Sequence, residues 1–204
     1  FDANATYPDP GAVFTDNVDS NVTIYGVGNL LASVPGTYVL NYDLNDTAGN
    51  SAIRLTRTVT VVDTTPPVIT LNGDPNLSHE ADPEYVDANA TWTDIVDGNG
   101  TVTATGEVNA SKLGTYVLNY ARTDNAGNVA LDVNRTVTVV DTQIPVITIL
   151  GDVNASHEAG FVYVDANANW TDNLDGNGTV DINSTQGGVN PYRPNVYYIT
   201  YSLT

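Results

Sequence analysis

Residues 93–101 read Thr-Asp-Ile-Val-Asp-Gly-Asn-Gly-Thr, and related copies of this segment occur at residues 15–23 and 171–179. Asp16, Asp94 and Asp172 are successively 78 residues apart. Recurrence at one fixed spacing indicates an array of small modules, and it outweighs the single domain that length alone would suggest. The 204-residue chain is therefore predicted to contain repeated units of about 78 residues.

Outward from this segment, the patterns within one unit are those of short strands. Val, Ile and Thr alternate with other residues at period two, which is typical of half-buried strands. The predicted strands of the second unit include residues 68–71, 101–105, 115–120 and 135–140. Asn, Asp and Gly cluster between them, at residues 72–74, 97–100 and 125–128, and favour tight turns. The prediction is an all-β chain of tandem Ig-like antiparallel β-sandwiches.

Module boundaries are predicted where one strand ends, the chain passes through proline, and the next strand begins. They give modules at residues 1–63, 64–141 and 142–204. Such short proline-containing joints are stiffer than Gly/Ser tethers, so successive modules are expected to form a semi-rigid array. The outer two sandwiches are expected to be incomplete, because the first lacks a counterpart of residues 68–71 and the third lacks a counterpart of residues 130–140.

Composition argues against several classes of function. The 24 acidic residues outnumber 6 basic ones and give a net charge of −18, which disfavours nucleic acid and anionic membranes as partners. Cysteine is absent, so disulfides and thiolate metal sites are impossible. No apolar run reaches the length of a membrane span. Motifs for a cysteine nucleophile, a serine elbow or a phosphate loop are also missing, and we predict a protein without catalytic activity.

Several longer motifs resemble a known family. They are TPPVITLNGD from residue 65, the HEA triplet at residues 79–81, GTYVLNY at residues 36–42 and 114–120, TDNAGN at residues 123–128 and RTVTVVD at residues 135–141. Together they resemble the bacterial and archaeal Ig-like surface modules that are related to hyalin-repeat domains. The resemblance implies tandem Ig-like sandwiches in adhesins, surface-layer proteins or large exoproteins, and a secreted or cell-surface location.

The acidic loops are candidate Ca²⁺ sites. In an Ig-like topology the two loops at residues 94–99 and 124–128 lie at the end where the preceding module joins, so that the linker residue Asp63 would reach them. Ca²⁺ takes about six to eight oxygen ligands, and clustered carboxylates repel one another without a cation. The aspartates proposed for sites at the inter-module junctions are Asp16, Asp19, Asp46, Asp63, Asp94, Asp97, Asp124, Asp141, Asp172 and Asp175. The alternative is that these residues only form tight turns.

The glycosylation acceptor pattern Asn-x-Ser/Thr is unusually frequent and predicts N-linked glycans. It occurs at Asn4, Asn21, Asn45, Asn76, Asn89, Asn99, Asn109, Asn134, Asn154, Asn169, Asn177 and Asn183. The alternative is that a repeat rich in Asn and Thr copies the same coincidence several times. A glycan on Asn99 would conflict with a cation bound by its amide oxygen. His79 beside Glu80 and His157 beside Glu158 are interpreted as structural residues.

The sequence therefore predicts a structural protein whose partners are neighbouring modules of the same chain or further copies of it. The first hypothesis is a semi-rigid stalk in an adhesin or surface-layer protein. The second is a subunit of an extracellular filament completed by neighbouring strands. The third is a carbohydrate-binding module, for which the region from Tyr192 to Tyr198 is the candidate aromatic platform.

Overall fold

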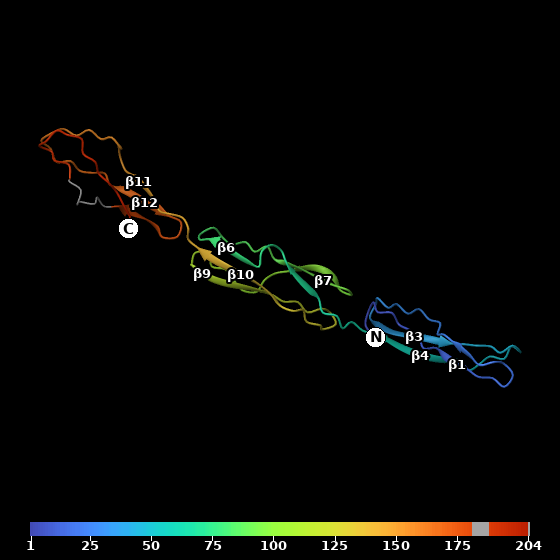
Figure 1. Ribbon diagram of the computed structural model, residues 1–204. Coiled ribbons are helices and arrows are strands. Elements are labelled where there is room, and N and C mark those ends of the chain that lie inside the picture. The colour runs from blue at the N-terminus through green and yellow to red at the C-terminus, as the bar shows by residue number, and fades with distance from the viewer. Residues whose placement is uncertain (181–187, 204) are drawn as a thin grey trace. The chain divides into compact units, whose positions relative to one another are not determined.

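The computed structural model describes residues 1–180 and 188–203, and every regular element among them is a β-strand (Figure 1). The first repeat contains β1 (Ala12–Phe14), β2 (Val22–Ile24), β3 (Gly36–Tyr42) and β4 (Leu55–Val61). The second contains β5 (Val68–Leu71), β6 (Asn76–Glu80), β7 (Ala90–Asp94), β8 (Gly98–Val102), β9 (Gly114–Tyr120) and β10 (Val133–Val140). The third contains β11 (Val146–Ile149), β12 (Ala168–Asp172) and β13 (Gly176–Val180). The predicted all-β class is confirmed.

Most strands lie where the alternation of β-branched residues predicts them, and one is displaced. The strand expected at residues 101–105 is β8 and begins at Gly98, because the turn after β7 is tight enough for Gly98 to pair directly with Asp94. Gly98 has a φ of 88° and its counterpart Gly176 a φ of 90°, a left-handed conformation that glycine adopts without steric cost. The Asp-Gly-Asn-Gly segment therefore supplies the turn and the first residues of the returning strand.

The sheets are small. Their strand orders are β1-β2, β3-β4, β5-β7-β8, β6-β10-β9 and β11-β12-β13. Neighbours joined by a hairpin are antiparallel, but β6 and β10 pair in parallel over residues 76–80 and 136–140. An equivalent parallel bridge joins Asp2 to Val62 in the first repeat. These parallel pairs join β6, and the equivalent segment at Asp2 in the first repeat, to the last strand of the same repeat.

The described chain divides into two compact units. The first contains Phe1–Pro75, Asp87–Gly106 and Val117–Arg135, and the second contains Asn76–Val86, Glu107–Tyr116 and Thr136–Thr204. The first unit includes β1 to β5, β7 and β8, and the second includes β6 and β11 to β13. β9 and β10 contribute residues to both, so the middle repeat is shared between the two units.

Each repeat contains one aromatic residue that pairs directly with a residue across a hairpin. Trp92 pairs directly with Gly100, and Trp170 with Gly178. A Cβ atom placed on Gly100 would lie 2.9 Å from the Trp92 ring nitrogen, so the indole fills the space that a side chain would need. In the first repeat the corresponding pair is a smaller ring and a larger partner, Phe14 and Val22. The total volume of each pair is thereby balanced.

A second buried feature is an Arg–Asp–Tyr network. It consists of Arg57, Asp9 and Tyr42 in the first repeat and Arg135, Asp87 and Tyr120 in the second. Each arginine forms an ion pair with its aspartate, and each tyrosine hydroxyl donates a hydrogen bond to the same carboxylate. In the third repeat the Tyr201 hydroxyl donates to Asp165. The network fastens the segment that carries the aspartate to the strand of the tyrosine.

Candidate cation site at a linker

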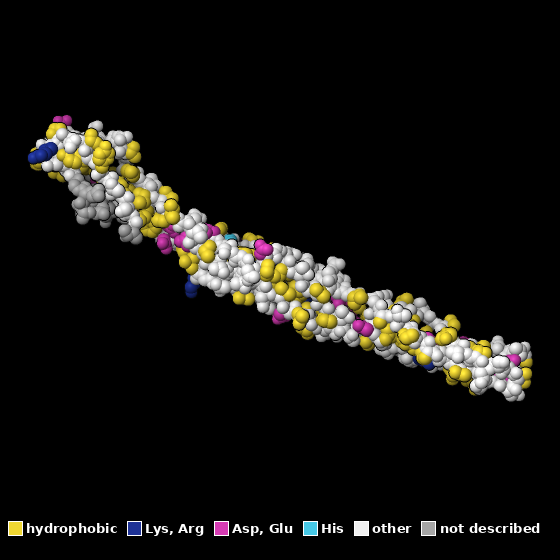
Figure 2. Space-filling model, in the orientation of Figure 1, with side chains coloured by type: hydrophobic (Ala, Val, Ile, Leu, Met, Phe, Trp, Pro, Cys, Tyr) yellow, Lys and Arg dark blue, Asp and Glu magenta, His cyan; other side chains and the backbone are white. Residues whose placement is uncertain are grey.

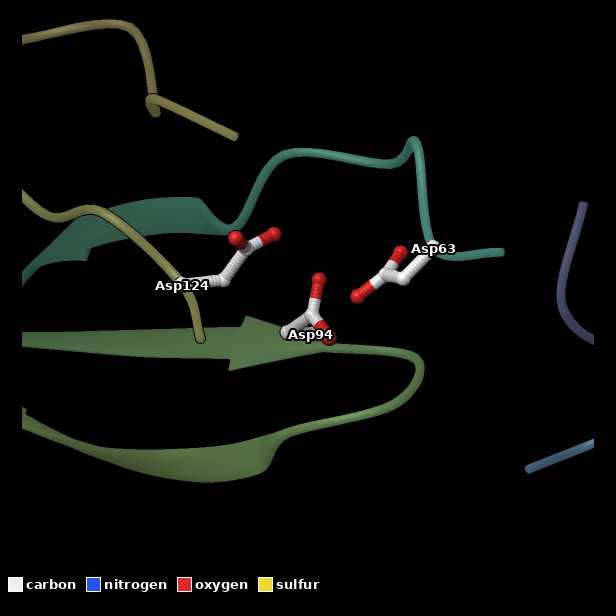
Figure 3. Close-up of side chains that lie close together, drawn as sticks. All are labelled: Asp63, Asp94 and Asp124. Atoms are coloured by element: carbon white, nitrogen blue, oxygen red, sulfur yellow. The ribbon is translucent and has the colours of Figure 1, made fainter. Parts of the chain in front are cut away.

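Three carboxylates converge where the linker after β4 meets two loops of the second repeat. They belong to Asp63 in the linker, Asp94 at the end of β7 and Asp124 in the loop after β9, and all three residues lie in the first unit. Figure 3 shows the three side chains turned toward one common space. One ligand oxygen from each lies within 4.8 Å of the others. Among the described residues, no other set of three or more His, Asp or Glu side chains comes together in this way.

Asp94 is positioned by the turn that follows it. Its Oδ1 atom accepts hydrogen bonds from the backbone N–H groups of Val96 and Asp97, both at 2.8 Å. This side-chain turn is the local preference of aspartate in tight turns. It leaves the other carboxylate oxygen, Oδ2, buried and without a hydrogen-bond partner. One oxygen of Asp94 thus shapes the turn, and the second points into the cluster.

Asp124 is positioned by hydrogen bonds to Asn128 in the same loop. Its Oδ1 atom accepts the Asn128 backbone N–H at 2.7 Å, and its Oδ2 atom accepts the Asn128 side-chain amide at 2.8 Å. Asp97 joins this loop to the first one, because its carboxylate accepts the Asn125 N–H at 2.8 Å. Asp97 therefore connects the two loops, whereas Asp94 and Asp124 face the shared space.

The linker is fixed on both sides of Asp63. Oδ1 of Asp63 accepts the Thr65 N–H at 3.1 Å, and the Asp63 carbonyl accepts the Asn128 side-chain amide at 3.2 Å. Asp2 accepts the Thr64 N–H at 3.0 Å and the Thr65 hydroxyl at 3.2 Å. The linker backbone is thus tied to the first repeat by Asp2 and to the second by Asn128.

The same clamp recurs at the next linker. Glu80 accepts the Thr142 N–H at 2.9 Å and the Thr142 hydroxyl at 2.7 Å. Sequence reasoning did not identify Asp2 and Glu80 as linker clamps. The available signal was an acidic residue at the same position of successive repeats, 78 residues apart.

Electrostatics distinguishes the members of the cluster. Burial raises the pKa of the Asp63 carboxyl above its usual range, and the nearby charges of Asp94 and Asp124 raise it further, against the lowering effect of the Thr65 N–H. Burial alone would also raise the pKa of Asp124, but the hydrogen bonds from Asn128 and the neighbouring backbone lower it overall. The charge of Asp63 is therefore less well compensated by the protein than that of Asp124.

The remaining candidate aspartates form parts of equivalent sites. Asp16 and Asp172 accept backbone N–H groups in the same turn as Asp94 does. In the first repeat Asp19 connects the loops through Thr47, and Asp46 is held by Asn50 as Asp124 is by Asn128. Asp141 accepts the Gln143 N–H at 3.2 Å, as Asp63 accepts that of Thr65. Asp175 donates its own backbone N–H to Asp172. The structure brings three carboxylates together only at Asp63, Asp94 and Asp124 among the described residues.

The predicted glycosylation acceptors lie mostly on the surface. Asn89 is half-buried, and the other described acceptors are exposed. Asn183 lies outside the described residues. Asn99 is exposed on β8. Surface exposure is what a glycan requires, and N-glycosylation stays a prediction.

The two histidines make local contacts. Nε2 of His79 donates to the Pro83 carbonyl at 2.8 Å, and its ring meets Tyr85 edge-on at 5.2 Å between centroids. His157 makes the equivalent contacts with Phe161 and Tyr163. Each histidine therefore has a packing partner and a backbone acceptor within its own repeat.

The repeated sandwiches and their clamped linkers define a tandem Ig-like surface-module protein. The chain belongs to the family of the bacterial surface protein Ig-like domain, whose model matches residues 2–61 and 69–139, more than half of the sequence. This is the kind of family that the sequence motifs resembled, and it indicates a structural role and a surface location. A comparison with curated proteins finds no match.

The charge on the visible surface agrees with the acidic composition. On the face shown in Figure 2, Lys and Arg side chains are isolated among more numerous acidic ones. In the described part of the chain, no helix has the length and apolar character needed to cross a membrane.

Proposed function

We propose that this chain is a stalk segment of a surface protein, in which successive Ig-like modules hold a distal part of the protein at a distance from the cell. The observation that carries the proposal is the repeated linker clamp. Asp2 binds Thr64 and Thr65 after the first repeat, and Glu80 binds Thr142 after the second. A linker whose backbone is hydrogen-bonded to the preceding module has little freedom to reorient.

The linker composition supports the same role. Pro66 and Pro67 follow the first clamp and Pro145 follows the second, and proline restricts the backbone and the residue before it. A flexible tether would instead contain Gly and Ser. The structural role of the family agrees with a spacer that has no catalytic task.

A distance measurement between the outer modules tests the stalk. Ile53→Cys and Val153→Cys place spin labels on two exposed positions, and the chain has no other cysteine. Double electron–electron resonance should give one narrow distance distribution. Replacing residues 64–67 and 142–145 by Gly/Ser of equal length should broaden it. A natural chain with a distribution as broad as that of the Gly/Ser variant would contradict the proposal.

The alternatives are separated by two further measurements on the same protein. Concentration-dependent polymers in analytical ultracentrifugation would favour the filament subunit over the stalk. Binding to a glycan array that is lost in the double variant Tyr192→Ala/Tyr198→Ala would favour the carbohydrate-binding module, since both rings are largely exposed. The stalk hypothesis expects a monomer and no glycan binding.

A further inference from the structure

Two buried carboxylate oxygens in the cluster have no hydrogen-bond partner. They are Oδ2 of Asp63 and Oδ2 of Asp94. The Asp63 residue is only 9% exposed, and its side chain is aimed at Asp94 and Asp124 (Figure 3). A buried carboxylate oxygen without a partner loses its hydration and gains nothing in return. Two such oxygens aimed at one space favour the binding of a ligand there.

Among the described residues, no protein cation pairs with these carboxylates. The ion pairs among the described residues join Arg54 to Asp43, Arg57 to Asp9, and Arg135 to Asp87. None of them involves the three carboxylates of the cluster. Three like charges whose oxygens lie within 4.8 Å therefore face one another without a compensating side chain. A cation from solution would compensate these charges.

The Oδ1 atoms of Asp63 and Asp94 accept backbone hydrogen bonds, and these bonds fix the orientation of the two carboxylates. Oδ1 of Asp63 is held by the Thr65 N–H, and Oδ1 of Asp94 by two backbone N–H groups. Asp124 is 7% exposed and is held by Asn128. The side chains are thus oriented by the backbone before any ion binds.

We propose that Asp63, Asp94 and Asp124 bind one Ca²⁺ ion. Two oxygens that each lie about 2.3 to 2.6 Å from a shared Ca²⁺ can be at most about 5 Å apart, and the observed limit of 4.8 Å satisfies this condition. All three ligand groups are hard oxygen donors, which Ca²⁺ prefers. Water molecules complete the coordination shell. The proposal does not use the exposed Asn99 as a ligand, so it leaves this side chain free to carry a glycan.

The number of sites follows from the geometry. Asp16 and Asp46 in the first repeat, and Asp141 and Asp172 at the second linker, are not part of such a cluster, and among the described residues only Asp63, Asp94 and Asp124 come together. We therefore expect one Ca²⁺ site in the described part of the chain. The inference does not depend on the stalk role.

Isothermal titration of the 204-residue chain with CaCl₂ tests the proposal, alongside thermal melting in Ca²⁺ and in EGTA. We expect one site with a Kd of about 0.1 to 1 mM, the range of extracellular modules, and a Tm that rises with Ca²⁺. Asp94→Asn should weaken binding by about tenfold or more, because it removes a ligand charge and retains the turn acceptor. Asp63→Asn should have the same effect.

Asp16→Asn is the matched control, since it alters the same turn in the first repeat, where no three carboxylates come together among the described residues. It should leave the Ca²⁺ affinity unchanged. Circular dichroism in EGTA checks that all variants are folded. A Tm that is equal in Ca²⁺ and EGTA, or equal losses of affinity in Asp16→Asn and Asp94→Asn, would overturn the proposal. An equal response to Mg²⁺ would overturn the assignment to calcium, because Mg²⁺ demands a tighter octahedral site.

Discussion

The first and second repeats contain the same Arg–Asp–Tyr network but bury it to different extents. The Arg135 side chain is 1% exposed, whereas that of Arg57 is 32% exposed. Arg135 donates to the Asp74 carbonyl at 3.2 Å and to the Asn72 carbonyl. Both carbonyls belong to the segment that follows β5. Arg57 instead donates to the Gly11 carbonyl at 3.1 Å.

The difference shows that identical side chains acquire different roles from the segment that covers them. Two carbonyls and the Asp87 carboxylate surround the Arg135 guanidinium, so its burial is compensated. An ion pair in such a site is costly to break on one side only, whereas an exposed pair contributes little. Equal sequence motifs therefore do not imply equal energetic contributions.

The largest expected effect comes from removing the buried arginine. Arg135→Met should destabilise the second repeat by about 3 to 5 kcal/mol, because Asp87 would be left as an uncompensated charge beside Tyr120. Arg57→Met should cause a clearly smaller loss, since solvent reaches Arg57. Urea unfolding of the whole chain, followed by far-UV circular dichroism, measures both.

Arg54→Ala is the control for this comparison, because the Arg54–Asp43 pair is exposed on both sides. Its Tm should not change measurably. Equal losses for Arg57→Met and Arg135→Met would show that burial of the network does not set its contribution.

Enlarging the glycine opposite Trp92 is expected to have an intermediate effect on stability. Gly100→Val should destabilise the second repeat by about 1 to 3 kcal/mol, because the new side chain would overlap the indole of Trp92. Adding Trp92→Phe to Gly100→Val should restore part of the loss, since Phe14 and Val22 form this combination in the first repeat. Thermal unfolding of the single and double variants measures the coupling. If the two substitutions lower the stability additively, the side-chain volumes at positions 92 and 100 are not coupled, and this explanation is wrong.

Lowering the pH is expected to have the smallest effect on the stability of the second repeat. Burial alone would raise the pKa of Asp87, but the hydrogen bonds from Tyr120 and the Asn89 N–H and the interactions with Arg135 lower it overall. A carboxyl with a lowered folded-state pKa stabilises the fold above its unfolded pKa of about 3.9 and loses this contribution as the pH falls through the lower folded value. Stability of the second repeat should therefore decrease below about pH 4.

Asp87→Asn isolates this contribution, because an amide does not titrate in that range. Urea unfolding between pH 2 and pH 5 should show a flatter acid dependence for Asp87→Asn than for the unaltered chain. If the stability of both proteins depends on pH in the same way, carboxylates other than Asp87 cause the loss of stability in acid.

Much of the fold could be predicted from short-range patterns. The 78-residue recurrence, the period-two alternation in residues 68–71 and 135–140, and the Gly-containing turns each depend on neighbours within a few residues. The pairing of β6 with β10 could not, because parallel partners about 60 residues apart leave no local signal. The network around Arg135 was missed for the same reason, although Asp9, Asp87 and Asp165 recur at the repeat spacing.

The loop at residues 93–101 illustrates the division between sequence and tertiary structure. The sequence by itself determined that this segment turns the chain, since an aspartate that accepts N–H groups two and three residues ahead is a local arrangement. Only the tertiary structure decided that Oδ2 of Asp94 meets Asp63 and Asp124, because these residues come from three separate segments. Their convergence depends on the linker clamp and on the packing of two loops.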